Sequence, residues 1–241
     1  MLNMKQAVQS LLIWVVGIIL ILILFLVMAF LSIILYPFDR KRKIVHAQCF
    51  WWTDAVTALN PYWNVRVIGL TNIDPKKAYV VVSNHQSLAD IVLMYKTKMQ
   101  FKWVAKESLF KVPVLGWNMA LARHISLRRG DFSSIKKVYR QVGEWLCKGV
   151  SVVFFPEGTR SDNHEMDVFQ NGAFKLAIKE KVPVLPIAIE GTKDAIPKRS
   201  WRFTTKVSCV IRVLAPIDTS GFLPQDFARL RELARARLSG D

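Results

Sequence analysis

The sequence has few cysteines and no paired cysteine motif. Three cysteines occur in 241 residues, at Cys49, Cys147 and Cys209, and no two of them form a Cys-x-x-Cys pair. An odd number of widely spaced cysteines argues against a disulfide framework and against a thiolate zinc site. We therefore expect free thiols in a reducing compartment.

Acidic residues are also scarce, because 34 Lys and Arg stand against 18 Asp and Glu and give a formal net charge of +16. Hydrophobic residues make up 52% of the chain. This apolar content excludes an intrinsically disordered or collagen-like protein, and the length corresponds to about one domain.

No charged residue occurs between Gln6 and Phe38, and residues 11–36 form an apolar run of 26 residues. A helix of that length reaches roughly 39 Å, whereas the hydrocarbon layer of a bilayer is about 30 Å thick. A cleaved signal peptide has a shorter apolar region followed by small residues, but this run ends at Tyr36-Pro37-Phe38. Residues 1–38 are therefore predicted to be a retained membrane anchor, which either crosses the bilayer or bends back through one leaflet.

The flanks of the apolar run predict its orientation. The block Asp39-Arg40-Lys41-Arg42-Lys43 lies on one side, and Lys5 with the N-terminal amine lies on the other. The positive-inside tendency then places the rest of the chain on the cytoplasmic side of the membrane. Residues 39–62 combine this basic block with Phe50, Trp51 and Trp52, which suits the lipid headgroup layer. The alternative is a packed helix whose tryptophans belong to the core.

Residues 63–241 alternate between strand-like and helix-like patterns, which predicts an α/β domain with a mixed sheet flanked by helices. Helices are expected to start near Ser87, Phe132, Asn171 and Gln225. The expected strands are 65–68, 79–83, 101–105, 124–127, 150–155, 184–190 and 206–213.

Three expected strands end in polar clusters, which are Asn84-His85-Gln86-Ser87, the segment 156–161, and Glu190-Gly191-Thr192. In the first, Ser87-x-x-Asp90 matches a helix-capping signature that directs the Asp90 carboxylate back toward His85. A carboxylate on Nδ1 fixes the imidazole tautomer and leaves Nε2 as a base. The alternative is that Asp90 only caps a helix and His85 lies in a turn.

The second cluster reads Phe155-Pro156-Glu157-Gly158-Thr159-Arg160-Ser161. It brings a glycine, a hydroxyl and a guanidinium together directly after a strand, a combination that binds an oxyanion such as phosphate. An ordinary surface ion pair between Glu157 and Arg160 is the alternative.

Taken together, these blocks resemble the membrane-bound glycerolipid acyltransferases, the lysophosphatidate acyltransferases of phosphatidate synthesis. Residues 84–90 resemble the His-x4-Asp catalytic block of that family, and residues 155–161 resemble its glycerol-phosphate-binding block. Lys106 with the segment 109–116 and the apolar segment 182–187 resemble two further blocks. One block departs from the family pattern, since Ala122 to Arg128 keeps only the terminal arginine and Arg129 competes with it for the same role.

The resemblance implies acyl transfer from acyl-CoA or acyl carrier protein to the free hydroxyl of lysophosphatidate. His85, oriented by Asp90, would remove the hydroxyl proton, and donors near Gly158 or Asn84 would stabilise the oxyanion. Neither a metal nor a resident cofactor is expected. The implied acceptor-binding residues are Lys106, Arg128, Glu157, Gly158, Thr159 and Arg160. In this interpretation the guanidinium of Arg160 binds phosphate, and Glu157 orients the glycerol or Arg160.

Residues 96–140 contain eleven Lys and Arg, and only Glu107 and Asp131 as acids. Such a surplus attracts anionic phospholipid or an anionic thioester carrier, and a plain solvated face is the alternative. Nucleic acid is not expected, because the sequence contains no recognised nucleic-acid module beside the anchor. Two other functions stay open: an acyltransferase for another lysolipid such as a lyso-aminolipid, and a non-catalytic adaptor that binds anionic lipid.

Overall fold

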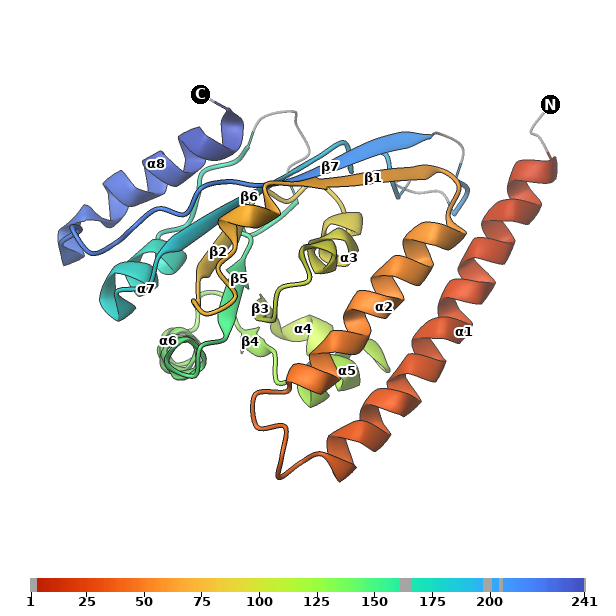
Figure 1. Cartoon of the computed structure of the whole chain (residues 1–241), viewed down its shortest axis with the longest axis horizontal. Helices are drawn as coiled ribbons and strands as arrows, with labels where there is room; N and C mark the ends of the chain where they lie inside the picture. Colours follow the sequence, from red (N-terminus) through yellow and green to blue (C-terminus); the bar gives the residue numbers. More distant parts are fainter. Residues whose placement is uncertain (1–3, 161–165, 197–200, 204–205, 241) are drawn as a thin grey trace.

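The computed structural model describes residues 4–160, 166–196, 201–203 and 206–240. Within these ranges the chain forms one seven-stranded sheet in the order β1-β7-β6-β2-β5-β3-β4 (Figure 1). All seven expected strands are present within two residues of their predicted bounds. They are β1 (Trp63–Ile68), β2 (Val80–Ser83), β3 (Phe101–Lys106), β4 (Ile125–Leu127), β5 (Ser151–Phe154), β6 (Val184–Glu190) and β7 (Val207–Val213).

The sheet is mixed, as predicted. Strands β6, β2, β5, β3 and β4 are parallel to one another, β7 is antiparallel to β6, and β1 is parallel to β7. The carboxyl ends of the five parallel strands therefore meet at one edge of the sheet, where ligand sites of α/β proteins lie. The polar clusters after β2, β5 and β6 share this edge.

Helices cover both faces of the sheet. Helices α6, α7 and α8 lie on one face, and α3 and α2 lie on the other (Figure 1). Strand β2 is buried on both sides, because Val81 belongs to one core cluster and Val80 and Val82 belong to the other. The helices are α1 (Met4–Ile34), α2 (Lys43–Leu59), α3 (Ala89–Met94), α4 (Glu107–Phe110), α5 (Leu115–Leu121), α6 (Phe132–Cys147), α7 (Gly172–Glu180) and α8 (Phe227–Ser239).

The apolar run forms a single helix, α1, that is long and apolar enough to cross a membrane. Most of its surface is exposed, but it also packs against the domain. The Ser10 hydroxyl accepts a hydrogen bond from the Phe203 N–H at 2.8 Å, and the Trp14 indole donates to the Trp201 carbonyl at 2.6 Å. Further along the helix, the Phe25 ring lies 5.7 Å from the ring of Trp117. Helix α1 is therefore attached to the domain at points well separated along its length.

The segment after the anchor forms a packed helix, α2. Val45 and His46 are buried, and the Thr53 hydroxyl donates a hydrogen bond to the Val92 carbonyl at 3.0 Å. Trp51 is the most exposed large apolar residue of this helix, with 71% of its surface exposed. Helix α2 is therefore packed against the domain along one side, whereas its tryptophans are not core residues, because Trp51 is exposed and Trp52 is half-buried.

Candidate active site

The His85 imidazole lies beside the Asp90 carboxylate, at the point where the chain leaves β2 and enters α3. Nδ1 of His85 is 2.9 Å from Oδ2 of Asp90. The Asp90 side chain is almost fully buried, whereas 13% of the His85 side chain is exposed. A buried carboxylate on Nδ1 leaves Nε2 as the basic nitrogen of a neutral ring. The contact predicted from the sequence is present.

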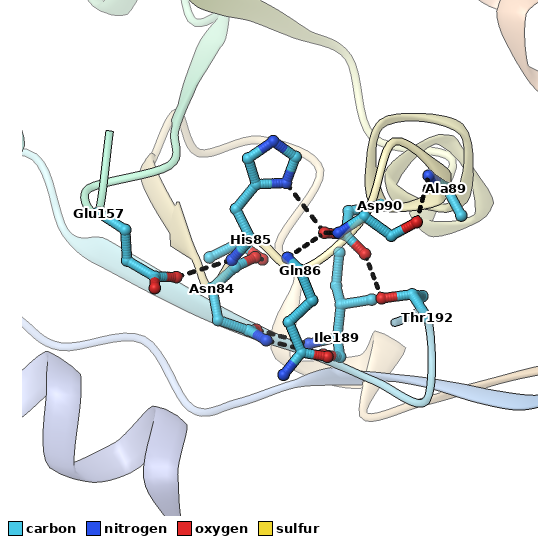
Figure 2. A network of polar contacts seen from close by, with 10 residues as sticks. Asn84, His85, Gln86, Ala89, Asp90, Glu157, Ile189 and Thr192 are labelled. Carbon is cyan, nitrogen blue, oxygen red and sulfur yellow. Dashed lines mark hydrogen bonds and ion pairs between the residues drawn. The ribbon is translucent and has the colours of Figure 1, made fainter. Parts of the chain in front are cut away.

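The capping residues at the start of α3 account for this contact. The helix begins at Ala89, two residues later than predicted, but the Ser87 hydroxyl accepts from the Ala89 N–H at 3.2 Å. Oδ2 of Asp90 accepts from the N–H groups of Gln86 and Ser87 at 2.7 and 2.8 Å. The carboxylate therefore points back along the chain toward His85 (Figure 2).

One face of the His85 ring is covered by a second aromatic ring. It stacks on the Phe155 ring with a centroid distance of 4.0 Å and an interplanar angle of 14°. Phe155 in turn stacks on Trp103 at 5.2 Å. The ring plane is thus fixed by an aromatic stack that could not be predicted from local patterns, because Phe155 and His85 follow different strands.

Glu157 joins the two motif blocks through backbone contacts. One carboxylate oxygen accepts from the His85 N–H at 2.8 Å, and the other accepts from the Asp167 N–H at 3.0 Å. Burial raises the pKa of the Glu157 carboxyl, although the two backbone donors act in the opposite direction. The carboxylate thus holds the loop that carries His85 (Figure 2), and the expectation that Glu157 orients the glycerol or Arg160 stays a prediction.

Two groups expected to stabilise an oxyanion are already hydrogen bonded. The Asn84 side-chain amide donates to the Ile189 carbonyl and accepts from the Ile189 N–H, both at 2.8 Å. The Gly158 N–H donates to the Phe155 carbonyl at 3.0 Å and closes a turn in which Gly158 has a φ of +78°. The Asn84 amide therefore connects the end of β2 to β6. Gly158 closes the turn after β5 in a backbone conformation that favours glycine.

The structure separates the two competing arginines after β4. The Arg128 guanidinium donates two hydrogen bonds of 2.9 Å to Glu107 and contacts Asp131 at 3.4 Å. Arg129 is exposed and approaches the turn after β5, since a Cβ placed on Gly158 would lie 3.7 Å from its terminal nitrogen. Arg128 is thus engaged by carboxylates, and Arg129 is the arginine beside the Gly158 turn.

The remaining expected ligands are exposed residues at the same edge. Thr159 and Arg160 follow β5, and Lys106 is the last residue of the neighbouring strand β3. Ser161 lies outside the described residues. The third polar cluster contributes a residue that received no role from the sequence, because the Thr192 hydroxyl donates a hydrogen bond to Oδ1 of Asp90.

Known proteins similar to this chain are acyltransferases. Residues 64–190 match the family model described as Acyltransferase. A 1-acyl-sn-glycerol-3-phosphate acyltransferase of Pseudomonas aeruginosa is 33% identical over 205 residues, which cover 83% of this chain and 77% of that protein. One from Chlamydomonas reinhardtii is 36% identical over 210 residues, covering 86% of this chain and 63% of that protein.

A solved structure is similar over the whole chain. The 1-acyl-sn-glycerophosphate (LPA) acyltransferase of Thermotoga maritima aligns with a TM-score of 0.77 and 26% identity, covering 100% of this chain and 99% of that one. The chain spans between 47% and 63% of the length of the algal, plant and mouse relatives that it matches.

Proposed function

The chain belongs to the acyltransferase family, and on that premise we propose that it transfers a fatty acyl group from a thioester to the free hydroxyl of lysophosphatidate, giving phosphatidate. The observation that carries the proposal is the His85–Asp90 pair at the carboxyl edge of the sheet. A partly exposed imidazole on a buried carboxylate is suited to remove a proton from an alcohol.

The proposed reaction uses His85 as base and then as acid. Nε2 of His85 takes the proton of the acceptor hydroxyl while the hydroxyl oxygen attacks the carbonyl carbon of the thioester. The C–S bond then breaks, and the thiolate leaves with the proton that His85 returns. Asp90 stabilises the imidazolium that forms between these steps. No metal or resident cofactor is needed for this sequence, and the acyl donor is acyl-CoA or acyl carrier protein.

Exposed guanidinium groups support a phosphate-bearing acceptor. Arg129 approaches the Gly158 turn from the end of β4, Arg160 follows Gly158 in the exposed segment after β5, and Lys106 ends the strand between β5 and β4. A guanidinium binds phosphate through two parallel hydrogen bonds, so Arg160 is proposed as the main phosphate ligand. Arg129 replaces Arg128 as its neighbour, because Arg128 is already paired with Glu107.

The test is product analysis with the purified full-length protein. Wild type is offered acyl-CoA or acyl carrier protein with a panel of lysolipids, and the products are identified by mass spectrometry. We expect phosphatidate from lysophosphatidate, and we expect His85→Ala to lower the turnover by about 10²–10⁴-fold. A different product would favour another lysolipid as acceptor. Equal turnover in wild type and His85→Ala would rule out His85 as the base and favour a non-catalytic lipid-binding adaptor.

We also propose that α1 associates with the membrane and that the catalytic domain lies on the cytoplasmic side. Leu22, Leu26 and Phe30 expose apolar surface on α1. Because contacts at Ser10 and Phe25 hold α1 along the domain, a full crossing would draw the neighbouring face of the domain into the hydrocarbon. We therefore favour insertion into one leaflet, with the basic residues 40–43 at the cytoplasmic headgroups.

This membrane proposal is tested with charged substitutions on the exposed face of α1. The double variant Leu22→Glu/Leu26→Glu is expected to abolish co-sedimentation with anionic vesicles and to keep the thermal midpoint measured in detergent. The matched control places the same two glutamates at Leu223 and Leu233, which are exposed elsewhere. Equal vesicle binding by the α1 variant and wild type would contradict the proposed attachment.

A further inference from the structure

Both oxygens of the buried Asp90 carboxylate are hydrogen bonded, but by different parts of the chain. Oδ2 accepts from the His85 ring and from the N–H groups of Gln86 and Ser87, all within five residues of Asp90. Oδ1 accepts from the hydroxyl of Thr192, which is 102 residues away. Figure 2 shows the carboxylate between the imidazole of His85 and the hydroxyl of Thr192.

The turn after β6 delivers Thr192 to this position. Strand β6 pairs with β2, so the chain leaving β6 emerges beside the segment that carries His85. Gly191 has a φ of +76°, and a Cβ there would lie 2.0 Å from the Ser208 carbonyl oxygen, so this turn requires glycine. The Thr192 carbonyl then accepts from the Ala195 N–H at 2.9 Å. The backbone on both sides of Thr192 is therefore fixed.

Building on the function proposed above, we propose that Thr192 is a positioning residue that fixes the Asp90 carboxylate, and through it the imidazole of His85. The hydroxyl bond on Oδ1 stops the carboxylate from turning about its Cβ–Cγ bond. Oδ2 then stays aligned with Nδ1 of His85, and Nε2 keeps its direction toward the acceptor hydroxyl. Displacement of the base by even about 1 Å lowers the rate of the chemical step strongly.

A purely structural role for Thr192 makes a different prediction. Thr192 is fully buried, and a buried threonine that only satisfies its hydroxyl affects the free energy of unfolding without affecting turnover selectively. Thr219 is a matched example, since it is 2% exposed and its hydroxyl donates to the Val182 carbonyl at 3.1 Å. Val182 precedes β6, so Thr219 lies at the opposite end of that strand from Thr192.

The experiment compares Thr192→Val, Thr192→Ser and Thr219→Val in the full-length protein, with lysophosphatidate and acyl-CoA in mixed micelles. Valine has the shape of threonine and lacks the hydroxyl. We expect Thr192→Val to lower kcat by about tenfold or more, because hydrogen bonds to charged groups are the stronger ones, with KM for either substrate within about twofold of wild type. Thr192→Ser should restore most of the kcat, and Thr219→Val should keep it.

Several outcomes would overturn the proposal. They are a Thr192→Val kcat within about twofold of wild type, a failure of Thr192→Ser to recover kcat, or an equal loss of kcat in Thr219→Val. If Thr192→Val does not fold, Thr192→Ala is measured in its place, with the same requirement on kcat. The His85→Ala variant separates the two proposals. An inactive His85→Ala beside a fully active Thr192→Val rejects only the positioning role, whereas an active His85→Ala rejects the proposed base.

Discussion

Two neighbouring parts of the sheet edge differ in how they hold their polar side chains. At the ends of β2 and β6, Asp90 and Thr192 are buried and hydrogen bonded to each other, and His85 is held by Asp90 and Phe155. At the ends of β4 and β5, Arg129 and Arg160 are exposed. The first part has a fixed geometry before any substrate arrives, and the second presents solvated cations.

This difference corresponds to two chemical tasks. A general base must be aligned with the reacting hydroxyl, so its orientation is fixed by groups that do not move during the reaction. A phosphate is recognised by charge and by paired hydrogen bonds, which exposed guanidinium groups supply when the ligand binds. Substitutions in the first part should therefore lower kcat, and those in the second should lower kcat/KM for phosphate-bearing acceptors.

The largest effect is expected from Asp90→Asn. The amide keeps the size of the side chain and one acceptor oxygen, but the carboxylate charge beside Nδ1 is lost. The imidazolium that forms when His85 takes the proton is then no longer stabilised by a carboxylate, and kcat should fall by about 10²–10⁴-fold. Steady-state kinetics at saturating acceptor measures this loss. A kcat within about tenfold of wild type would contradict the proposal that the ends of β2 and β6 form the catalytic part of the edge.

The next largest effect is expected from Arg160→Ala. Loss of a charge-assisted bidentate contact should lower kcat/KM for lysophosphatidate by about 10–100-fold, and the wild-type preference for lysophosphatidate over monoacylglycerol should largely disappear. Arg160→Lys keeps the charge without the planar fork and should recover part of the loss. The ratio of kcat/KM for the two acceptors is the measurement. An unchanged ratio would remove Arg160 from the phosphate site.

A smaller effect distinguishes the two arginines after β4. Arg129→Ala removes the cation beside the Gly158 turn and should lower the preference for lysophosphatidate by about tenfold. Arg128→Ala removes an exposed ion pair with Glu107, and such pairs contribute little, so its effect should stay within about twofold. Both variants are compared by the same acceptor ratio. The reverse order of effects would restore Arg128 as the phosphate ligand.

The sequence predicts the strands and the His85–Asp90 contact because both depend on local patterns. Buried strands such as β2 are continuous apolar runs, and the Ser87-x-x-Asp90 spacing directs the carboxylate toward His85 within one turn. The short helices α4 and α5 were not predicted, because four and seven residues contain too little periodicity to detect.

Long-range partners could not be predicted in this way. Thr192 was visible as part of a polar cluster, but its bond to Asp90 depends on β6 lying beside β2, which is a matter of strand order. Hydropathy predicts that α1 is apolar and gives no information on the residues that pack against the domain, such as Ser10. Glu107 pairs with Arg128 and leaves Arg129 at the turn, and this choice depends on the pairing of β3 with β4.

The last prediction compares His85 with a histidine in the core. His46 is buried against the Phe101 and Tyr95 rings, and its Nε2 lies 3.1 Å from the Met99 carbonyl oxygen. Burial, aided by the nearby Lys102 cation, lowers the pKa of His46 to about 3. The unfolded chain has a histidine pKa of about 6.5 and therefore binds a proton that the folded chain excludes. His46 accordingly lowers stability as the pH falls below about 6.5, and has no such effect above it.

His46→Phe isolates this contribution, because phenylalanine keeps an aromatic ring in the same packing and does not titrate. Between pH 7.5 and pH 5.5 the wild type should lose about 1.4 kcal/mol more of its unfolding free energy than the variant does. Loss of the Met99 hydrogen bond affects the variant at both pH values and cancels in this difference. Chemical denaturation in detergent at the two pH values is the measurement. If the unfolding free energies of the two proteins depend equally on pH, the folded state binds a proton at His46. Burial would then not explain the difference between this histidine and His85.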